Sequence, residues 1–133
     1  MWFIFNRKEH KEDTKFTKKN TLDKMITWVD FEKIEMRVGT ILEVNDFPEA
    51  RNPAYKLRID LGEFGIKKSS AQITPLYTKE ELLHKQVIAV VNFPPKQIGK
   101  FMSECLVLGV VGINKEVTLL QPERTVENGL RIA

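Results

Sequence analysis

The sequence predicts an all-β domain with at least five strands and little helix. Short stretches alternate apolar and polar residues and are rich in β-branched side chains, most clearly residues 55–61 (YKLRIDL). A period of two is that of a half-buried strand. Clusters of Gly, Pro and Asn separate these stretches, and one helix-start pattern falls between the third and the fourth of them. Many strands with so little helix favour a barrel or a sandwich.

The composition is that of one globular domain. The chain has 133 residues, of which 42% are apolar and 29% charged, and this length suits a single core. The one cysteine, Cys105, excludes an internal disulfide and predicts a reducing, cytoplasmic location. No apolar run reaches the length of a membrane span, and the opening MWFIF is too short for a signal-peptide core, so we expect no membrane insertion.

The positive charge of the chain is confined to its N-terminal part. The formal net charge is +3, and residues 1–24 carry seven basic and four acidic residues, which accounts for the whole excess. The remaining 14 basic and 14 acidic residues cancel. A dedicated nucleic-acid binder usually carries a clear basic excess. Any positive binding surface on the folded body is therefore expected to be local.

Residues 1–24 differ in composition from the rest of the chain, because they are lysine-rich and lack a sustained hydrophobic period. Two interpretations stay open. The segment is an N-terminal extension, or translation begins naturally at Met25. The predicted domain covers residues 25–133.

The first elements are predicted from local patterns. The stretch TWVD from Thr27 is typical of a helix start, and we expect a short helix over residues 29–34. Residues 36–44 (MRVGTILEV) form the first predicted strand, in which Gly39 indicates a bulge or a sharp bend. Two prolines exclude regular ladder structure from the connection over residues 45–54.

The middle of the chain continues the pattern. Residues 55–61 and 66–73 form the second and third predicted strands, separated by a glycine-containing turn. A capping-box pattern at Thr78 opens a short helix that reaches about His84. Residues 86–92 form the fourth strand.

The last elements are less regular. Residues 93–103 form a connection that contains two consecutive prolines, and residues 104–113 form the fifth strand. Residues 117–121 and 130–132 are further extended pieces.

A helix between strands three and four is typical of the OB-fold, a five-stranded Greek-key barrel. Short helices and N- and C-terminal extensions complete the predicted architecture. Ligands of this fold lie across strands two and three, between the first-to-second and fourth-to-fifth loops. Here these loops are residues 45–54 and 93–103.

Four lysines offer a local basic patch near that face. Lys67 and Lys68 lie on strand three, and Lys96 and Lys100 lie on the fourth-to-fifth loop. Such a patch suits phosphates or acidic peptide groups; the alternative is an ordinary solvated surface. Successive strand residues point to opposite faces, so at most one of Lys67 and Lys68 is expected in the site.

Polar side chains at the same face suit hydrogen bonding to a ligand. Ser70 and Gln72 share one face of strand three, although they are equally consistent with an exposed polar face. Asn92 offers both a donor and an acceptor; the alternative is a turn-forming cap.

Apolar groups on the fourth-to-fifth loop complete the candidate pocket. Pro94 and Pro95 stiffen the loop, while Phe93, Phe101 and Met102 offer apolar contact. Phe101 is equally consistent with a core position.

Three further residues have competing structural roles. Arg37 is expected to form an ion pair with Glu104, or else to hold a ligand carboxylate or phosphate. Ser103 and Glu104 are binding candidates, with a turn before strand five as the alternative.

Catalysis has little support. His10 and His84 lack metal-ligand spacing, and no nucleophile, zinc or phosphate-loop motif occurs. Cys105 is expected to be a small buried hydrophobic residue. We therefore expect no enzyme activity, no metal and no cofactor.

Residues 30–110 resemble the tRNA-binding domain family, an OB-fold module found free and appended to some aminoacyl-tRNA synthetases. The motifs that carry the resemblance are Arg37-Val38-Gly39, Phe47-Pro48-Glu49-Ala50, Lys56-Leu57 with Asp60-Leu61-Gly62, Asn92-Phe93-Pro94-Pro95-Lys96 and Ser103-Glu104. Within that family, FPEARNPAYKL, KKSSAQIT, KQVIAVVNFPP and VTLLQPERTVENGLRI resemble the CsaA group of export-related chaperones.

The resemblance implies a non-enzymatic homodimer that binds unfolded or pre-export polypeptides. The alternative is a tRNA-binding protein of the synthetase-appended type. The tRNA-binding relatives usually carry Ser-Glu-Gly-Met, whereas this chain has Ser-Glu-Cys-Leu from Ser103, which favours the chaperone. The predicted peptide- or tRNA-binding residues are Arg37, Lys68, Ser70, Gln72, Asn92, Phe93, Pro95, Lys96, Lys100, Met102, Ser103 and Glu104.

Overall fold

The computed structural model describes residues 24–133, and these divide into two units. Residues 24–34 hold α2 (Trp28–Glu32), and residues 35–133 form the second unit. A reciprocal capping box opens α2, with the Asp30 N–H donating to Thr27 Oγ1 and the Thr27 N–H donating to the Asp30 carboxylate. The helix thus starts one residue before the predicted range of 29–34 and ends two residues before its end. The predictions for residues 1–23 lie outside the described residues.

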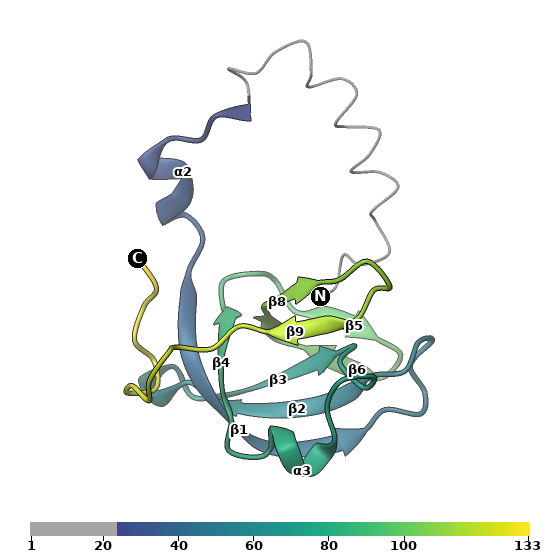
Figure 1. Ribbon diagram of the computed structural model, residues 1–133. Coiled ribbons are helices and arrows are strands. Elements are labelled where there is room, and N and C mark those ends of the chain that lie inside the picture. The colour runs from purple at the N-terminus through teal and green to yellow at the C-terminus, as the bar shows by residue number, and fades with distance from the viewer. Residues whose placement is uncertain (1–23) are drawn as a thin grey trace. The chain divides into compact units, whose positions relative to one another are not determined.

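The second unit is built on one antiparallel sheet that curls into a nearly closed barrel (Figure 1). Its strands are β1 (Met36–Asp46), β2 (Tyr55–Asp60), β3 (Ile66–Ala71), β4 (Gln86–Val90) and β7 (Leu106–Val107). They lie in the order β3-β2-β1-β4-β7, and the two end strands contact each other. This confirms the predicted all-β class and the OB-fold.

The buried residues of the barrel core follow the two-residue period of a strand. In β2 and the residue after it, Leu57, Ile59 and Leu61 are fully buried, whereas Arg58 between them is exposed. Between β3 and β4, α3 (Lys79–Leu82) opens with a second capping box and buries Leu82 against the barrel. The helix therefore lies at the predicted place, although it ends before His84.

The bulge in β1 lies further along the strand than predicted. Leu42 has no partner in β2, because the register shifts between Ile41 and Glu43. Gly39 instead lets the backbone of β1 lie close to Ile59 and Leu61. A Cβ atom there would lie 2.5 Å from the Ile59 Cγ2 atom and 2.8 Å from a Leu61 methyl group.

Two predictions for the last third of the chain are wrong. The connection over residues 93–103 contains a hairpin of β5 (Lys96–Ile98) and β6 (Phe101–Ser103). The predicted strand over residues 104–113 is two strands, because after β7 the chain enters a separate hairpin of β8 (Gly109–Val111) and β9 (Val117–Leu119).

The C-terminal segment covers an edge that β2 leaves open. β2 pairs only with the second half of β1, from Thr40 onward. Beside the first half, the Val38 amide and carbonyl bond to Leu130 and Gly129, and Ile132 donates to Met36. The yellow segment runs beside β1 in Figure 1. The predicted extended piece over residues 130–132 is therefore present, with one bridge between Arg37 and Arg131.

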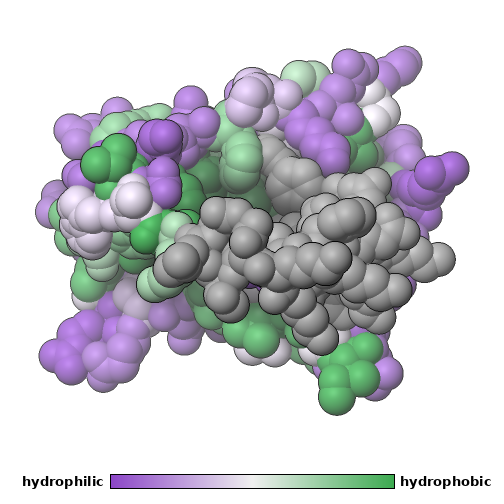
Figure 2. Space-filling view, turned by 90° about the horizontal axis from the view of Figure 1, so that it is seen from above, coloured by the Kyte–Doolittle hydropathy of each residue, from purple (hydrophilic) through white to green (hydrophobic). Residues whose placement is uncertain are grey.

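The barrel unit also exposes hydrophobic side chains. Figure 2 shows hydrophobic patches set among hydrophilic residues on the face seen from above. Val110, Ile113 and Leu120, on or beside the β8–β9 hairpin, are exposed. Within residues 24–133, no helix is long and apolar enough to cross a bilayer.

Candidate binding cleft

A cleft of about 520 Å³ opens between the β1–β2 loop and the β5–β6 hairpin. These are the two connections that frame the ligand face of an OB-fold. The volume lies within the range of small-ligand sites. Its lining residues are Phe47, Glu49, Lys56, Gly99, Lys100 and Phe101.

Two aromatic rings form the apolar part of the cleft. The centroids of Phe47 and Phe101 lie 5.3 Å apart, and the rings are tilted by 60°, which is a favourable aromatic geometry. Phe47 is buried, whereas Phe101 is half-buried and open to a ligand. The rings therefore offer a rigid apolar surface at low entropic cost.

Lysines surround this aromatic pair. Lys56 Nζ lies 5.5 Å from the Phe47 ring centroid, and Lys68 Nζ lies 5.4 Å from the Phe101 centroid. Cations within about 6 Å of a ring are attracted to its face. Together with Lys100, they outnumber the single carboxylate of Glu49 in the cleft.

The hairpin turn places Lys100 and Phe101. Gly99 and Lys100 form a two-residue turn between β5 and β6, and Gly99 has φ +61°. Glycine at the first position is the pattern of a type II′ turn, whose twist matches the flanking strands. The sequence analysis did not predict this hairpin, because the two prolines before it indicated an irregular loop.

Ser103 and Glu104 close the barrel beside the cleft. Fully buried Ser103 accepts the Ser70 N–H through Oγ at 3.2 Å, and Glu104 accepts the Lys68 N–H through Oε1 at 2.9 Å. The Glu104 N–H donates to the Lys68 carbonyl at 2.7 Å. Both side chains thus stand in for strand carbonyls along the edge of β3.

We predict a graded effect of substitutions at Glu104. Glu104→Ala leaves the Lys68 N–H without its acceptor and should lower the free energy of unfolding by about 1 kcal/mol. Glu104→Gln keeps an oxygen acceptor and should change it much less. Urea denaturation measures both variants. Equal losses in the two would contradict a hydrogen-bonding role.

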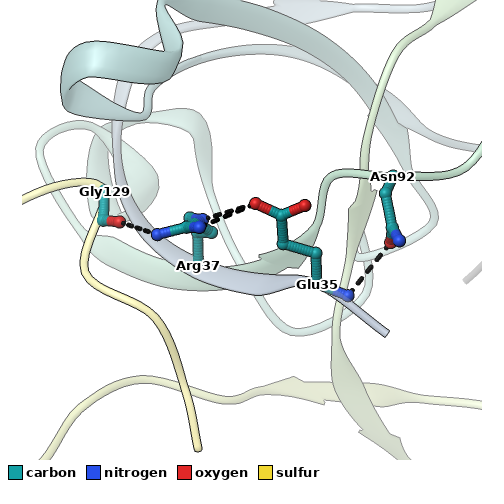
Figure 3. A network of polar contacts seen from close by, with 4 residues as sticks. All are labelled: Glu35, Arg37, Asn92 and Gly129. Carbon is teal, nitrogen blue, oxygen red and sulfur yellow. Dashed lines mark hydrogen bonds and ion pairs between the residues drawn. The ribbon is translucent and has the colours of Figure 1, made fainter. Parts of the chain in front are cut away.

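Arg37 is held by Glu35 and the C-terminal segment and not by Glu104. Its guanidinium donates twice to Glu35 Oε1, at 2.7 and 2.9 Å, and once to the Gly129 carbonyl at 2.9 Å (Figure 3). It also stacks 4.0 Å from the Phe64 ring centroid. The predicted ion pair with Glu104 is therefore wrong, and Arg37 ties the C-terminal segment to β1.

We expect Arg37→Met to lower the free energy of unfolding by about 1–2 kcal/mol, because it removes charge-assisted hydrogen bonds from a side chain that is only 17% exposed. Arg124→Met is the matched control, since Arg124 and Glu123 form a fully solvated ion pair. Urea denaturation should show no measurable change in the control. Equal effects of the two substitutions would contradict the assignment.

The other predicted site residues are spread over the barrel. Asn92 accepts the Glu35 N–H through Oδ1 at 3.0 Å, beside Arg37 (Figure 3). Ser70 is buried. Gln72 is half-buried just beyond β3, and Pro95 and Lys96 are exposed at the start of the β5–β6 hairpin. Phe93 and Met102 are more than a third exposed.

Of the predicted set, Lys68 lies over the Phe101 ring and Lys100 lines the cleft. The predicted site did not include Phe47, Glu49 or Lys56. A signal was present for each. Phe47 and Glu49 lie in the first-to-second loop, and Lys56 lies on the polar face of strand two, which is the ligand face of the fold.

Cys105 is buried next to the closing seam, as predicted, and burial raises the pKa of its thiol to about 12. An unfolded cysteine ionises near pH 8.5. The thiol's contribution to stability is therefore complete below pH 8.5 and declines as the pH rises toward 12.

We predict negligible reaction of the native protein with a disulfide reagent at pH 8 and rapid reaction in denaturant. Equal rates would contradict the burial.

No group of three or more His, Cys, Asp or Glu residues suited to a metal ion occurs in the described part of the chain.

Comparison with known proteins identifies the relatives of this barrel. Residues 36–131 match the family model "Putative tRNA binding domain". The solved CsaA chaperone from Picrophilus torridus is 57% identical, with a TM-score of 0.77, over 82% of this chain and 100% of that one. The chaperone CsaA from Bacillus anthracis is 49% identical, with a TM-score of 0.79, over 82% of this chain and 99% of that one.

Enzymes also contain this module. Methionine–tRNA ligase of Leptospira biflexa is 38% identical over 107 residues, which are 80% of this chain but 15% of the enzyme. The chain thus spans about one seventh of the length of that curated relative.

Proposed function

This chain belongs to the family described as "Putative tRNA binding domain", and from this premise we propose that it is a CsaA-like chaperone. It binds unfolded or precursor polypeptides reversibly in the cytoplasm, as a homodimer, and performs no chemical step. High identity to two CsaA chaperones over nearly their whole length supports the proposal.

The observation that carries the proposal is the cleft between Phe47 and Phe101. The tilted rings offer apolar contact to a client side chain, and the lysines around them offer charge. Phe93 and Met102, on the same connection as Phe101, offer further exposed apolar surface, although neither lines the cleft. A shallow site of this kind suits weak, broad recognition of extended segments.

The proposed dimer raises avidity. Two clefts on one particle convert the second contact with a long client into an intramolecular event. Exposed Val110, Ile113 and Leu120 support a contact surface at the β8–β9 hairpin. Equilibrium sedimentation of the full chain measures this state directly.

The second candidate function is tRNA binding. The family description and the local lysines Lys56, Lys68 and Lys100 favour it. Lysine contacts with phosphates release counterions, so this binding would weaken steeply with salt. The balanced charge of residues 25–133 favours the polypeptide instead.

Fluorescence anisotropy on the full chain separates the two. A labelled, permanently unfolded protein and labelled bulk tRNA are titrated in parallel over a salt series. We expect polypeptide binding that persists at high salt, with tRNA binding weak or lost. Tight tRNA binding that falls steeply with salt, without polypeptide binding, would overturn the chaperone assignment.

A further inference from the structure

We propose that the Phe47–Phe101 cleft selects polypeptide segments in which an apolar side chain stands next to a carboxylate. The apolar side chain lies against the two rings, and the carboxylate meets Lys68 and Lys100. This inference rests on the proposed function and names the chemical class of segment that the same cleft takes.

The cleft presents a rigid apolar surface. Phe101 packs its ring against buried Phe47, so neither ring is free to collapse into the cleft. A rigid aromatic surface loses little conformational freedom when a ligand covers it. Aliphatic and aromatic side chains can cover this surface, whereas a small polar side chain leaves the two rings exposed to water.

The cleft also holds positive charge that no ion pair compensates. Within residues 24–133, Lys56, Lys68 and Lys100 form no ion pair. Lys79, by contrast, meets Asp46 at 2.9 Å. The cleft therefore holds three positive charges against one carboxylate, and a client carboxylate supplies the missing partner.

The geometry also sets the spacing between the two features. Lys68 Nζ lies 5.4 Å from the centroid of the Phe101 ring, and Lys100 precedes Phe101 in the turn. A carboxylate bound to Lys68 therefore lies close to an apolar side chain that covers the Phe101 ring. Acidic and apolar residues adjacent in a client segment satisfy both contacts.

The same charges disfavour basic segments. A client lysine in this position meets two or three like charges across a short distance, and Glu49 is the one acidic residue in the cleft lining. No arginine, the residue best suited to bidentate phosphate recognition, lines the cleft, and Arg58, the cross-strand neighbour of Lys68, is paired with Glu43 at 3.3 Å. These features favour a carboxylate over a nucleic-acid backbone.

The test uses labelled 12-residue peptides and the full chain, followed by anisotropy at low and moderate salt. Four peptides differ only at one central pair: Leu-Asp, Leu-Asn, Leu-Lys and Ala-Asp. We expect Leu-Asp to bind tightest, with each loss of a favourable charge weakening binding by about two- to fivefold. Ala-Asp should also bind more weakly, because it leaves the rings uncovered.

Two matched variants locate the effect. Lys68→Met keeps the apolar stem over Phe101 but removes the charge, so it should reduce the preference for Leu-Asp over Leu-Asn while Leu-Asn binding persists. Lys85→Met changes a half-buried lysine just before β4, which does not line the cleft. It should keep the full preference.

The outcomes are separable. Equal binding of Leu-Asp, Leu-Asn and Leu-Lys would overturn this inference and leave the proposed function standing. No binding of these peptides or of unfolded protein would overturn both. Equal loss of preference in the two lysine variants would show a general charge effect and contradict a role for the cleft. Displacement of every peptide by low concentrations of bulk tRNA would make the cleft a nucleic-acid site and overturn the inference.

Discussion

Phe101→Ala is expected to weaken binding of an unfolded polypeptide by about tenfold or more. The substitution removes one of the two rings that form the apolar surface of the cleft. Loss of contact with a large apolar side chain is worth about 1.5–3 kcal/mol, and a factor of ten corresponds to about 1.4 kcal/mol. The measurement is anisotropy with a labelled unfolded protein at moderate salt.

Two further variants make the result specific. Phe101→Leu keeps an apolar side chain and should retain most of the binding. Leu83→Ala removes an exposed apolar side chain just after α3, away from the cleft lining, and should leave binding unchanged. Thermal unfolding must confirm that each variant is folded. Equal binding by Phe101→Ala and the unchanged protein would remove the cleft from the proposed function.

Gly39→Val is expected to lower the free energy of unfolding by about 3 kcal/mol or more. Even a Cβ atom at this position would lie 2.5 Å from Ile59 Cγ2, and 3.1 Å from the Asp60 carbonyl. Ile59 is fully buried and β-branched, so it cannot rotate away. Overpacking of such a site typically costs about 1–3 kcal/mol, and the two further methyl groups of valine add to it.

A graded series measures this effect by urea denaturation. Gly39→Ala should lie between the unchanged protein and Gly39→Val. Thr118→Val, at an exposed position of β9, should leave stability nearly unchanged and shows that added valine alone is harmless. Gly39→Val with full stability would contradict the close approach of β1 to β2.

The sequence predicted those parts of the fold that depend on local pattern. The alternation in β2 identified the buried face correctly, because each residue's face is set by a period of two. The capping boxes at Thr27 and Thr78 marked both helix starts, because the two reciprocal hydrogen bonds are local.

Two predictions failed although the contacts that decide them are local in the sequence. Arg37 was assigned to Glu104 across the barrel, whereas Glu35, two residues away on the same side of the strand, is its partner. The β5–β6 hairpin depends on a two-residue turn at Gly99 that two nearby prolines obscured.

The candidate site could be predicted only in part, because its two rings come from loops far apart in the sequence. Phe47 and Phe101 meet because the barrel closes, with Ser103 and Glu104 bonded to β3. No periodicity within either loop encodes that contact. The lysines were easier to identify, since Lys68 and Lys100 lie on elements that face an OB-fold ligand.

The measurement that tests the central claim most directly is NMR mapping of an unfolded polypeptide on the ¹⁵N-labelled full chain. The amides of Phe47, Lys56, Lys68, Lys100 and Phe101 should shift first and most, while those of the β8–β9 hairpin stay unchanged on titration. Shifts that avoid the cleft and gather elsewhere on the barrel would contradict it.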